Sequence, residues 1–288
     1  MFEAMLLGTG MGRPDPKRFA PSNLLWFRDR PVLVDCGPGV TFRLGSAGVR
    51  PSQIGNVFVT HFHADHFFEF PWLNKYTIIM GNVDEAIKER GNMRFHGPPG
   101  SHRILKQLDE SGDQMDDIAA LGGYDKVREF MTPEIEEIYN GWTLDYGSWK
   151  VRASLVDHGD CKLPCFAFRF ESGSKSVVFT GDTVGCENLT QLAKGADVMV
   201  HECNFPEEEV EARKRLGLAW WIHSTPTMAG EHAQAARVKK LVLNHFVGWD
   251  DFSPNKDPYD WEKIAPPRVK EHFDGEVILG EDLMKIEI

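Results

Sequence analysis

Six consecutive residues in the first quarter of the chain constrain its fold more than any other feature. They read His61-Phe62-His63-Ala64-Asp65-His66 and directly follow the apolar run Val57–Thr60, which is typical of a buried strand. The segment offers several metal-ligating side chains at once, and packing them together without a cation would cost several kcal/mol of desolvation. It therefore predicts a metal site at the carboxyl end of a strand, where α/β folds collect functional residues.

The rest of the chain alternates short apolar runs with helical patterns, which predicts an α/β fold. The expected strands are Ala4–Leu7, Leu24–Phe27, Val32–Val34, Val57–Thr60, Val151–Val156, Cys165–Phe170, Ser176–Thr180, Val198–His201, Lys240–Leu243 and Val277–Leu279. The expected helices are Glu85–Arg90, Ser101–Leu108, Glu207–Leu216 and Thr227–Arg237, the last opened by Ser224-Thr225-Pro226. A length of 288 residues allows one large core, so we expect a single domain over 1–288. Within it, about 81–140 is expected to be a helical excursion over the site, serving as a lid or a dimer surface.

Three further segments offer ligands at the ends of expected strands. They are Asp157-His158-Gly159, Gly181-Asp182-Thr183 and His245-Phe246. Taken alone, each of these polar residues would more often be a capping or core residue. Together with the first cluster they complete a set for two adjacent cations.

The order of these motifs resembles the metallo-β-lactamase superfamily, near its ribonuclease Z and arylsulfatase-like branch. The resemblance rests on Leu7-Gly8-Thr9-Gly10, Asp35-Cys36-Gly37-Pro38-Gly39, His61 to His66, His96-Gly97-Pro98-Pro99-Gly100, His158, Gly181-Asp182-Thr183, His201-Glu202-Cys203, His223-Ser224-Thr225-Pro226 and Asn244-His245-Phe246. It implies a four-layer αβ/βα sandwich, with two sheets face to face, helices outside and a dinuclear site at one edge.

The resemblance also implies which residues bind two zinc ions. The ligands of one ion would be His61, His63 and His158, those of the other Asp65, His66 and His245, with Asp182 as the bridge. Imidazole-rich sites with a shared carboxylate suit zinc, and iron or manganese in one position stays open. Asp35 would orient a ligand histidine, unless it is a plain turn residue.

A histidine and a glutamate are expected beside the metals on the same grounds. His223 would donate a proton or stabilise an oxyanion, with Glu202 orienting it, whereas a helix cap is the alternative for His223. Asp65 is a second candidate for handling the proton. For His201 a packed position is expected, and four other histidines show no ligand context: His96, His102, His232 and His272.

The spacing of the motifs and the net charge both argue against tRNA as a partner. Ribonuclease Z proteins that process tRNA carry a basic arm between the third metal histidine and the bridging aspartate, but here Gly159–Pro164 and two strands fill that interval. The net charge of −11 also disfavours nucleic-acid binding.

Five cysteines at irregular spacing, Cys36, Cys161, Cys165, Cys186 and Cys203, indicate reduced thiols. With neither a secretory signal nor a membrane span recognisable, we expect a cytoplasmic protein without a membrane partner.

Aromatic residues flank the metal motif and precede His223, which indicates a pocket for an aryl or acyl group. The candidates are Phe68, Trp72, Trp220 and Trp221, each with the core or an oligomer interface as the alternative.

The expected function is a dinuclear zinc hydrolase of a small organic ester, lactone, β-lactam or aryl sulfate, using a metal-bridging hydroxide. The alternative is a ribonuclease Z-type phosphodiesterase acting on RNA or on small or cyclic nucleotides. A catalytically idle metal-binding module is a third hypothesis, and a homo-oligomer stays open.

Overall fold

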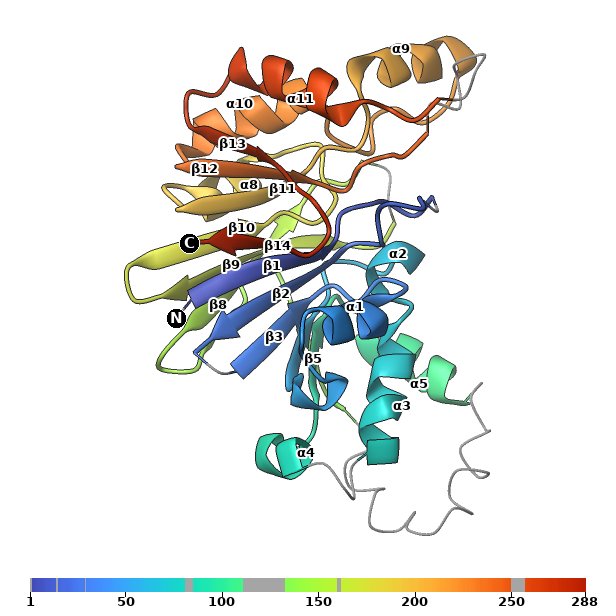
Figure 1. Cartoon of the computed structure of the whole chain (residues 1–288), viewed down its shortest axis with the longest axis vertical. Coiled ribbons are helices and arrows are strands. Elements are labelled where there is room, and N and C mark those ends of the chain that lie inside the picture. Colours follow the sequence, from blue (N-terminus) through green and yellow to red (C-terminus); the bar gives the residue numbers. More distant parts are fainter. Residues whose placement is uncertain are drawn as a thin grey trace.

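The computed structural model describes residues 2–13, 15–28, 30–80, 85–110, 133–159, 162–249 and 257–288. Two β-sheets lie face to face, and helices cover the outer face of each one (Figure 1). The four-layer α/β sandwich expected from the sequence is therefore confirmed. None of the helices in the described ranges is long and apolar enough to cross a membrane.

Each sheet has seven strands. In spatial order, the first contains β14 (Met284–Glu287), β1 (Phe2–Gly8), β2 (Ser22–Phe27), β3 (Arg30–Val34), β4 (Asn56–Phe58), β5 (Arg94–Gly97) and β6 (Glu134–Glu137). The second contains β13 (Glu276–Leu279), β12 (Lys240–Asn244), β11 (Val198–Glu202), β10 (Lys175–Phe179), β9 (Cys165–Ser172), β8 (Lys150–Val156) and β7 (Thr143–Asp145).

The helices divide between the two outer faces. On the side of the first sheet lie α1 (Val40–Ser46), α2 (Ala64–Phe67), α3 (Phe70–Met80), α4 (Glu85–Arg90) and α5 (Ser101–Glu110) (Figure 1). On the side of the second lie α8 (Glu187–Ala193), α9 (Glu207–Leu216), α10 (Pro226–Ala236) and α11 (Trp261–Lys270). Since both sheets are covered on both faces, their central strands are apolar throughout, which is why they were readable as strands.

The core between the sheets is rich in aromatic rings. Phe58 of β4 packs edge to face against Phe170 of β9, with ring centroids 5.2 Å apart. Separate apolar clusters fill the space under the helices on each outer face. Of the cysteines, Cys36, Cys165, Cys186 and Cys203 are free thiols, and Cys161 lies outside the described residues.

One expectation about the fold needs correction. The interval 81–140 contains the helices α4 and α5, but it also contributes β5 and β6 to the first sheet. The hydrophobic pattern does not predict β6, because this edge strand reads Glu-Ile-Glu-Glu and has no apolar run. Residues 81–84 and 111–132 lie outside the described residues, so a lid or dimer surface there stays a prediction.

Strand direction determines where the site lies. Strands β10, β11 and β12 are mutually parallel, as are β3 and β4. Both β1 and β3 run antiparallel to β2, and both β8 and β10 run antiparallel to β9. The carboxyl ends of β1, β3 and β4 therefore meet at one edge of the first sheet, and those of β8, β10, β11 and β12 meet at one edge of the second. A bridge from Gly10 to Phe246 joins the two sheets at this edge.

Candidate metal centre and active site

The metal-ligand motif begins directly after β4 and ends inside α2. His61 and His63 precede the helix in extended or turning backbone, whereas Asp65 and His66 belong to its single turn. This change of backbone conformation sends the four side chains in two directions. The segment thus contributes to two ligand groups rather than one.

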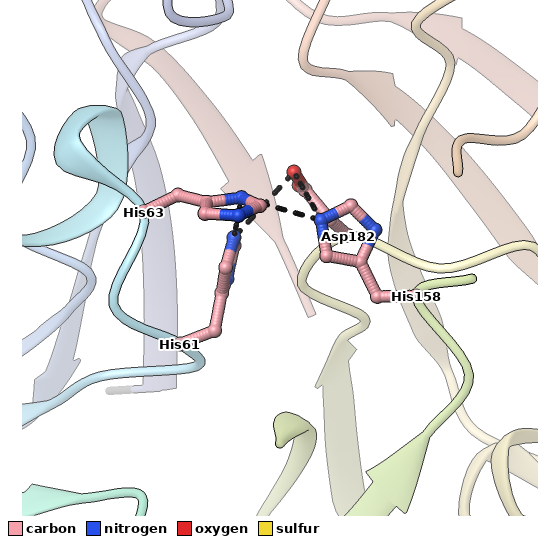
Figure 2. Close-up of side chains that lie close together, drawn as sticks. All are labelled: His61, His63, His158 and Asp182. Carbon is pink, nitrogen blue, oxygen red and sulfur yellow. Dashed lines mark hydrogen bonds and ion pairs between the residues drawn. The ribbon is translucent and has the colours of Figure 1, made fainter. Parts of the chain in front are cut away.

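Three histidines and one aspartate form the first group (Figure 2). Nδ1 of His63 lies 3.0 Å from Nε2 of His61 and 3.3 Å from Nε2 of His158. Oδ2 of Asp182 lies 3.6 Å from His61 Nε2 and 3.7 Å from His158 Nε2. Two atoms that each lie about 2.0–2.1 Å from one tetrahedral zinc are roughly 3.3 Å apart. The spacing of this group therefore fits a single cation.

The second group consists of Asp65, His66 and His245. The two imidazoles face each other with their Nε2 atoms 3.1 Å apart, and Asp65 Oδ2 lies 3.3 Å from His245 Nε2. The second group draws on both sheets. His245 follows β12 of the second sheet, whereas Asp65 and His66 follow β4 of the first.

Asp182 connects the groups. Its Oδ2 faces the first, while its Oδ1 lies 3.2 Å from His66 Nε2 and 3.3 Å from His245 Nε2. Oδ1 is buried and has no hydrogen-bond partner among the described residues. Burial opposes ionisation, but the imidazoles of His245 and His66 outweigh it and hold the pKa of Asp182 well below its usual range. A buried carboxylate between facing imidazoles fits divalent cations on both sides.

The outward nitrogens of the ligand histidines are hydrogen-bonded. His66 Nδ1–H donates to Asp35 Oδ2 at 2.8 Å, and His158 Nδ1–H donates to the carbonyl of Ile222 at 2.6 Å. His61 Nδ1 lies 3.0 Å from the hydroxyl of Thr60. The backbone N–H of Thr60 in turn donates to Asp35 Oδ1 at 2.8 Å. These contacts direct Nε2 toward the centre. Asp35 thus lies where the sequence expected it, whereas the sequence did not single out Thr60, although it directly precedes the motif.

His223 and Glu202 form a buried pair beside this centre. His223 Nδ1 lies 2.8 Å from Glu202 Oε2, and the backbone N–H of Thr183 donates to Oε1. Burial and the Asp182 carboxylate raise the pKa of Glu202, and burial lowers the pKa of His223. Both shifts disfavour the charged forms, a Glu202 carboxylate and a His223 imidazolium. The two side chains therefore favour a neutral pair that shares one proton between Glu202 Oε2 and His223 Nδ1. The cap of α10 is Thr225, which accepts from Met228 N–H, so His223 does not serve as the cap.

The remaining histidines lie outside the centre. His201 is buried, with its Nδ1–H donating to the Glu202 carbonyl at 2.6 Å and its Nε2 3.0 Å from His232 Nδ1. His96 is buried and stacks on Phe58, whereas His102 and His272 are exposed. None of these belongs to a ligand group in the described part of the chain.

The four pocket aromatics are all partly or largely exposed: Phe68, Trp72, Trp220 and Trp221. A cavity of about 20 Å³ touches His66, Asp182 and His245, and none of the four lines it. The loop with Trp220 and Trp221 nevertheless approaches the ligands, because its Ile222 carbonyl accepts from His158. Within the described ranges, Phe68 and Trp72 make no such contact to a ligand residue.

Comparison with known proteins supports a common origin. The family model described as "Anti-Pycsar protein Apyc1" matches residues 2–215. A ribonuclease Z from Mycolicibacterium gilvum is 30% identical over 290 residues, covering 100% of this chain and 96% of the relative. A ribonuclease Z from Mycobacterium bovis is 31% identical over 297 residues, with 100% and 99% covered.

Solved structures share the fold. The metallo-β-lactamase fold protein YhfI from Bacillus subtilis aligns with a TM-score of 0.74 at 20% identity, covering 100% of this chain and 99% of YhfI. The short form of human tRNase Z aligns with a TM-score of 0.71 at 22% identity, covering 99% of each chain. Zn²⁺-bound PqqB from Methylobacterium extorquens aligns with a TM-score of 0.66 at 14% identity, covering 99% of this chain and 100% of PqqB. The chain is therefore a metal-dependent hydrolase of the metallo-β-lactamase fold, and it belongs to the family described as anti-Pycsar protein Apyc1, with ribonuclease Z proteins among its relatives.

Proposed function

We propose that this protein is a dinuclear zinc phosphodiesterase that acts on short or cyclic nucleotides. The observation that carries the proposal is the double ligand group around Asp182 in a chain whose full-length relatives are named ribonuclease Z. These relatives support a phosphodiester over the ester, lactone, β-lactam or aryl sulfate that the sequence also allowed. Zinc is proposed because imidazole and carboxylate ligands at this spacing suit it.

The residues divide the chemistry between them. Two zinc ions bound by the ligand groups would supply Lewis-acid charge beside the phosphoryl group. Because its pKa is raised, the Glu202 carboxyl can hold the proton that it shares with His223 Nδ1, so the imidazole carries its own proton on Nε2. Nε2 would give that proton to the departing oxygen while Nδ1 takes the proton from Glu202, which is left as a carboxylate. Glu202 keeps the imidazole oriented, because Thr183 N–H fixes its other carboxylate oxygen. Asp65 is the second candidate for the proton transfer.

The size of the substrate follows from what surrounds the centre. His158 and Asp182 are joined by a short loop and two strands, which leaves no room for a tRNA-binding arm. Trp221 offers an exposed ring on the loop that is tied to His158, and base stacking on such rings is worth about 1–3 kcal/mol. The backbone at Gly12 passes close to the centre, since an added Cβ there would lie 3.2 Å from the Asp65 carboxyl. These features favour a small molecule with a base, whose phosphoryl charge the two cations would meet.

A substrate panel tests the proposal. The zinc-loaded protein would be assayed with bis(p-nitrophenyl) phosphate, dinucleotides and cyclic nucleotides, and with p-nitrophenyl acetate, p-nitrophenyl sulfate and a chromogenic β-lactam. We expect kcat/KM for the best phosphodiester to exceed that for every other class by roughly 100-fold, about 2.7 kcal/mol of transition-state stabilisation. An Asp182→Ala protein purified in parallel controls for contaminating nucleases. Faster turnover of the acetate, sulfate or β-lactam would refute the proposal.

A further inference from the structure

His245 differs from the other ligand histidines in the group that meets its outward nitrogen. Its Nδ1 lies 2.7 Å from the side-chain amide nitrogen of Asn204, which is fully buried. The backbone of His245 has a φ of +63°, a left-handed conformation that is unfavourable for a residue other than glycine. Asn244 Oδ1 accepts from the His245 backbone N–H at 2.8 Å and so helps to maintain it.

An amide N–H donating to Nδ1 would conflict with metal binding. A neutral imidazole carries one proton, so an Nδ1 that accepts leaves that proton on Nε2. Nε2 of His245 is the atom that faces His66 Nε2 at 3.1 Å and Asp182 Oδ1 at 3.3 Å. A protonated Nε2 cannot bind a cation, because the lone pair it needs is occupied.

The amide is not held in that orientation by its oxygen. Oδ1 of Asn204 is buried and meets no donor among the described residues. The two ends of an amide have nearly the same shape, so a half-turn about the last side-chain bond exchanges them without new steric demands. After the turn, Oδ1 lies beside Nδ1 and accepts its proton.

The neighbouring ligands show the same arrangement. His66 donates from Nδ1 to a carboxylate, and His158 donates from Nδ1 to a backbone carbonyl, which leaves both Nε2 atoms unprotonated. We infer that Asn204 is the positioning residue for His245, accepting from its Nδ1–H through Oδ1 and so fixing Nε2 as the metal-binding atom. Asn204 follows Glu202 by two positions, so the end of β11 and the loop after it orient both His223 and His245.

The tautomer of His245 in the zinc-free protein provides the first test. The inference rests on the metal centre of the proposed function but not on its substrate, so this readout is independent of activity. Long-range ¹H–¹⁵N correlation spectra, assigned with a His245→Gln variant, should show the proton on Nδ1. A proton on Nε2 would overturn the inference, and the measurement needs no Asn204 variant to fold.

Metal affinity provides the second test. Competition with a chromophoric chelator should show one zinc bound about 10–100-fold more weakly in Asn204→Ala, as for other removed partners of ligand histidines. Asn204→Asp retains an acceptor, so its affinity should equal or exceed that of the wild type. Asn188→Ala, which removes an exposed amide of α8 that donates to the Leu155 carbonyl, is the control. Unchanged affinity in Asn204→Ala, or equal losses in Asn204→Ala and Asn204→Asp, would refute the assignment.

Discussion

The two carboxylate oxygens of Asp182 face different ligand groups, so in the proposed dinuclear centre this one residue would serve both metal sites. Removing it would take a ligand from each proposed cation and leave the imidazoles of His66 and His245 facing each other. We therefore expect Asp182→Ala to weaken both zinc sites, measured as zinc content after dialysis against a weak chelator. The exposed Asp145→Ala should keep full metal content. Two tightly bound zinc ions in Asp182→Ala would contradict the bridging role.

His223 is the residue for which the tertiary structure removes an alternative, because Thr225 occupies the cap of α10. We expect His223→Ala to retain both metals and its melting temperature while kcat falls by about 10²–10⁴-fold, the range for positioned acid–base groups. The loss should be smaller for a p-nitrophenyl leaving group than for a nucleoside, because a good leaving group needs less protonation.

Three measurements on the same preparation decide the role of His223: metal content, melting temperature and kcat for both leaving groups. The exposed His272→Ala is the matched control. A normal kcat with the nucleoside leaving group would remove His223 from the mechanism.

At the scale of elements, β11 carries a pair of buried histidine contacts next to the site residue Glu202. His201 at its end donates to the Glu202 carbonyl and contacts His232 of α10. Burial and the neighbouring His232 lower the pKa of His201 to about 3, and burial lowers the pKa of His232 to about 4. Both imidazoles are thus neutral in the native protein at pH values where the unfolded chain takes up protons.

This contact predicts how stability depends on pH. Because the native pKa values lie below the unfolded value of about 6.5, acid favours the unfolded state, and stability falls as pH decreases through 6.5 toward about 4. Each such histidine costs about 1.4 kcal/mol between pH 7.5 and 5.5. We expect His232→Gln to lose about 1.4 kcal/mol less than the wild type over this interval, measured by urea unfolding. His272→Gln is the control, and equal losses in wild type and His232→Gln would contradict the assignment.

At the scale of the whole molecule, net charge and the missing arm are the two features from which we predict how the protein behaves toward tRNA. A charge of −11 repels phosphate backbones, since contacts from Lys and Arg supply most nucleic-acid affinity. We expect no binding or site-specific 3′ cleavage of precursor tRNA at about 150 mM salt. Gel assays with a ribonuclease Z relative as positive control test this. Efficient trimming under those conditions would refute it, whereas slow cleavage at low salt is compatible with an open dinuclear site.

Much of this molecule was predictable from local sequence. Apolar runs marked the central strands because those strands are covered on both faces, and the spacing from His61 to His66 marked a metal site because few other functions bring such residues together. The strands β5, β6, β7 and β14 escaped prediction, since a polar or very short strand has no periodic pattern of its own.

Other features were decided only by the tertiary structure. His66 and His245 are far apart along the chain, yet their Nε2 atoms lie 3.1 Å apart because β4 and β12 end at the same edge of two facing sheets. The same closure places Asp182 between the two ligand groups, brings Ile222 to His158 and sets Asn204 against His245. Local sequence determines which side chains can bind a metal, but the packing of the two sheets determines which of their atoms face the cation and which face a hydrogen-bond partner.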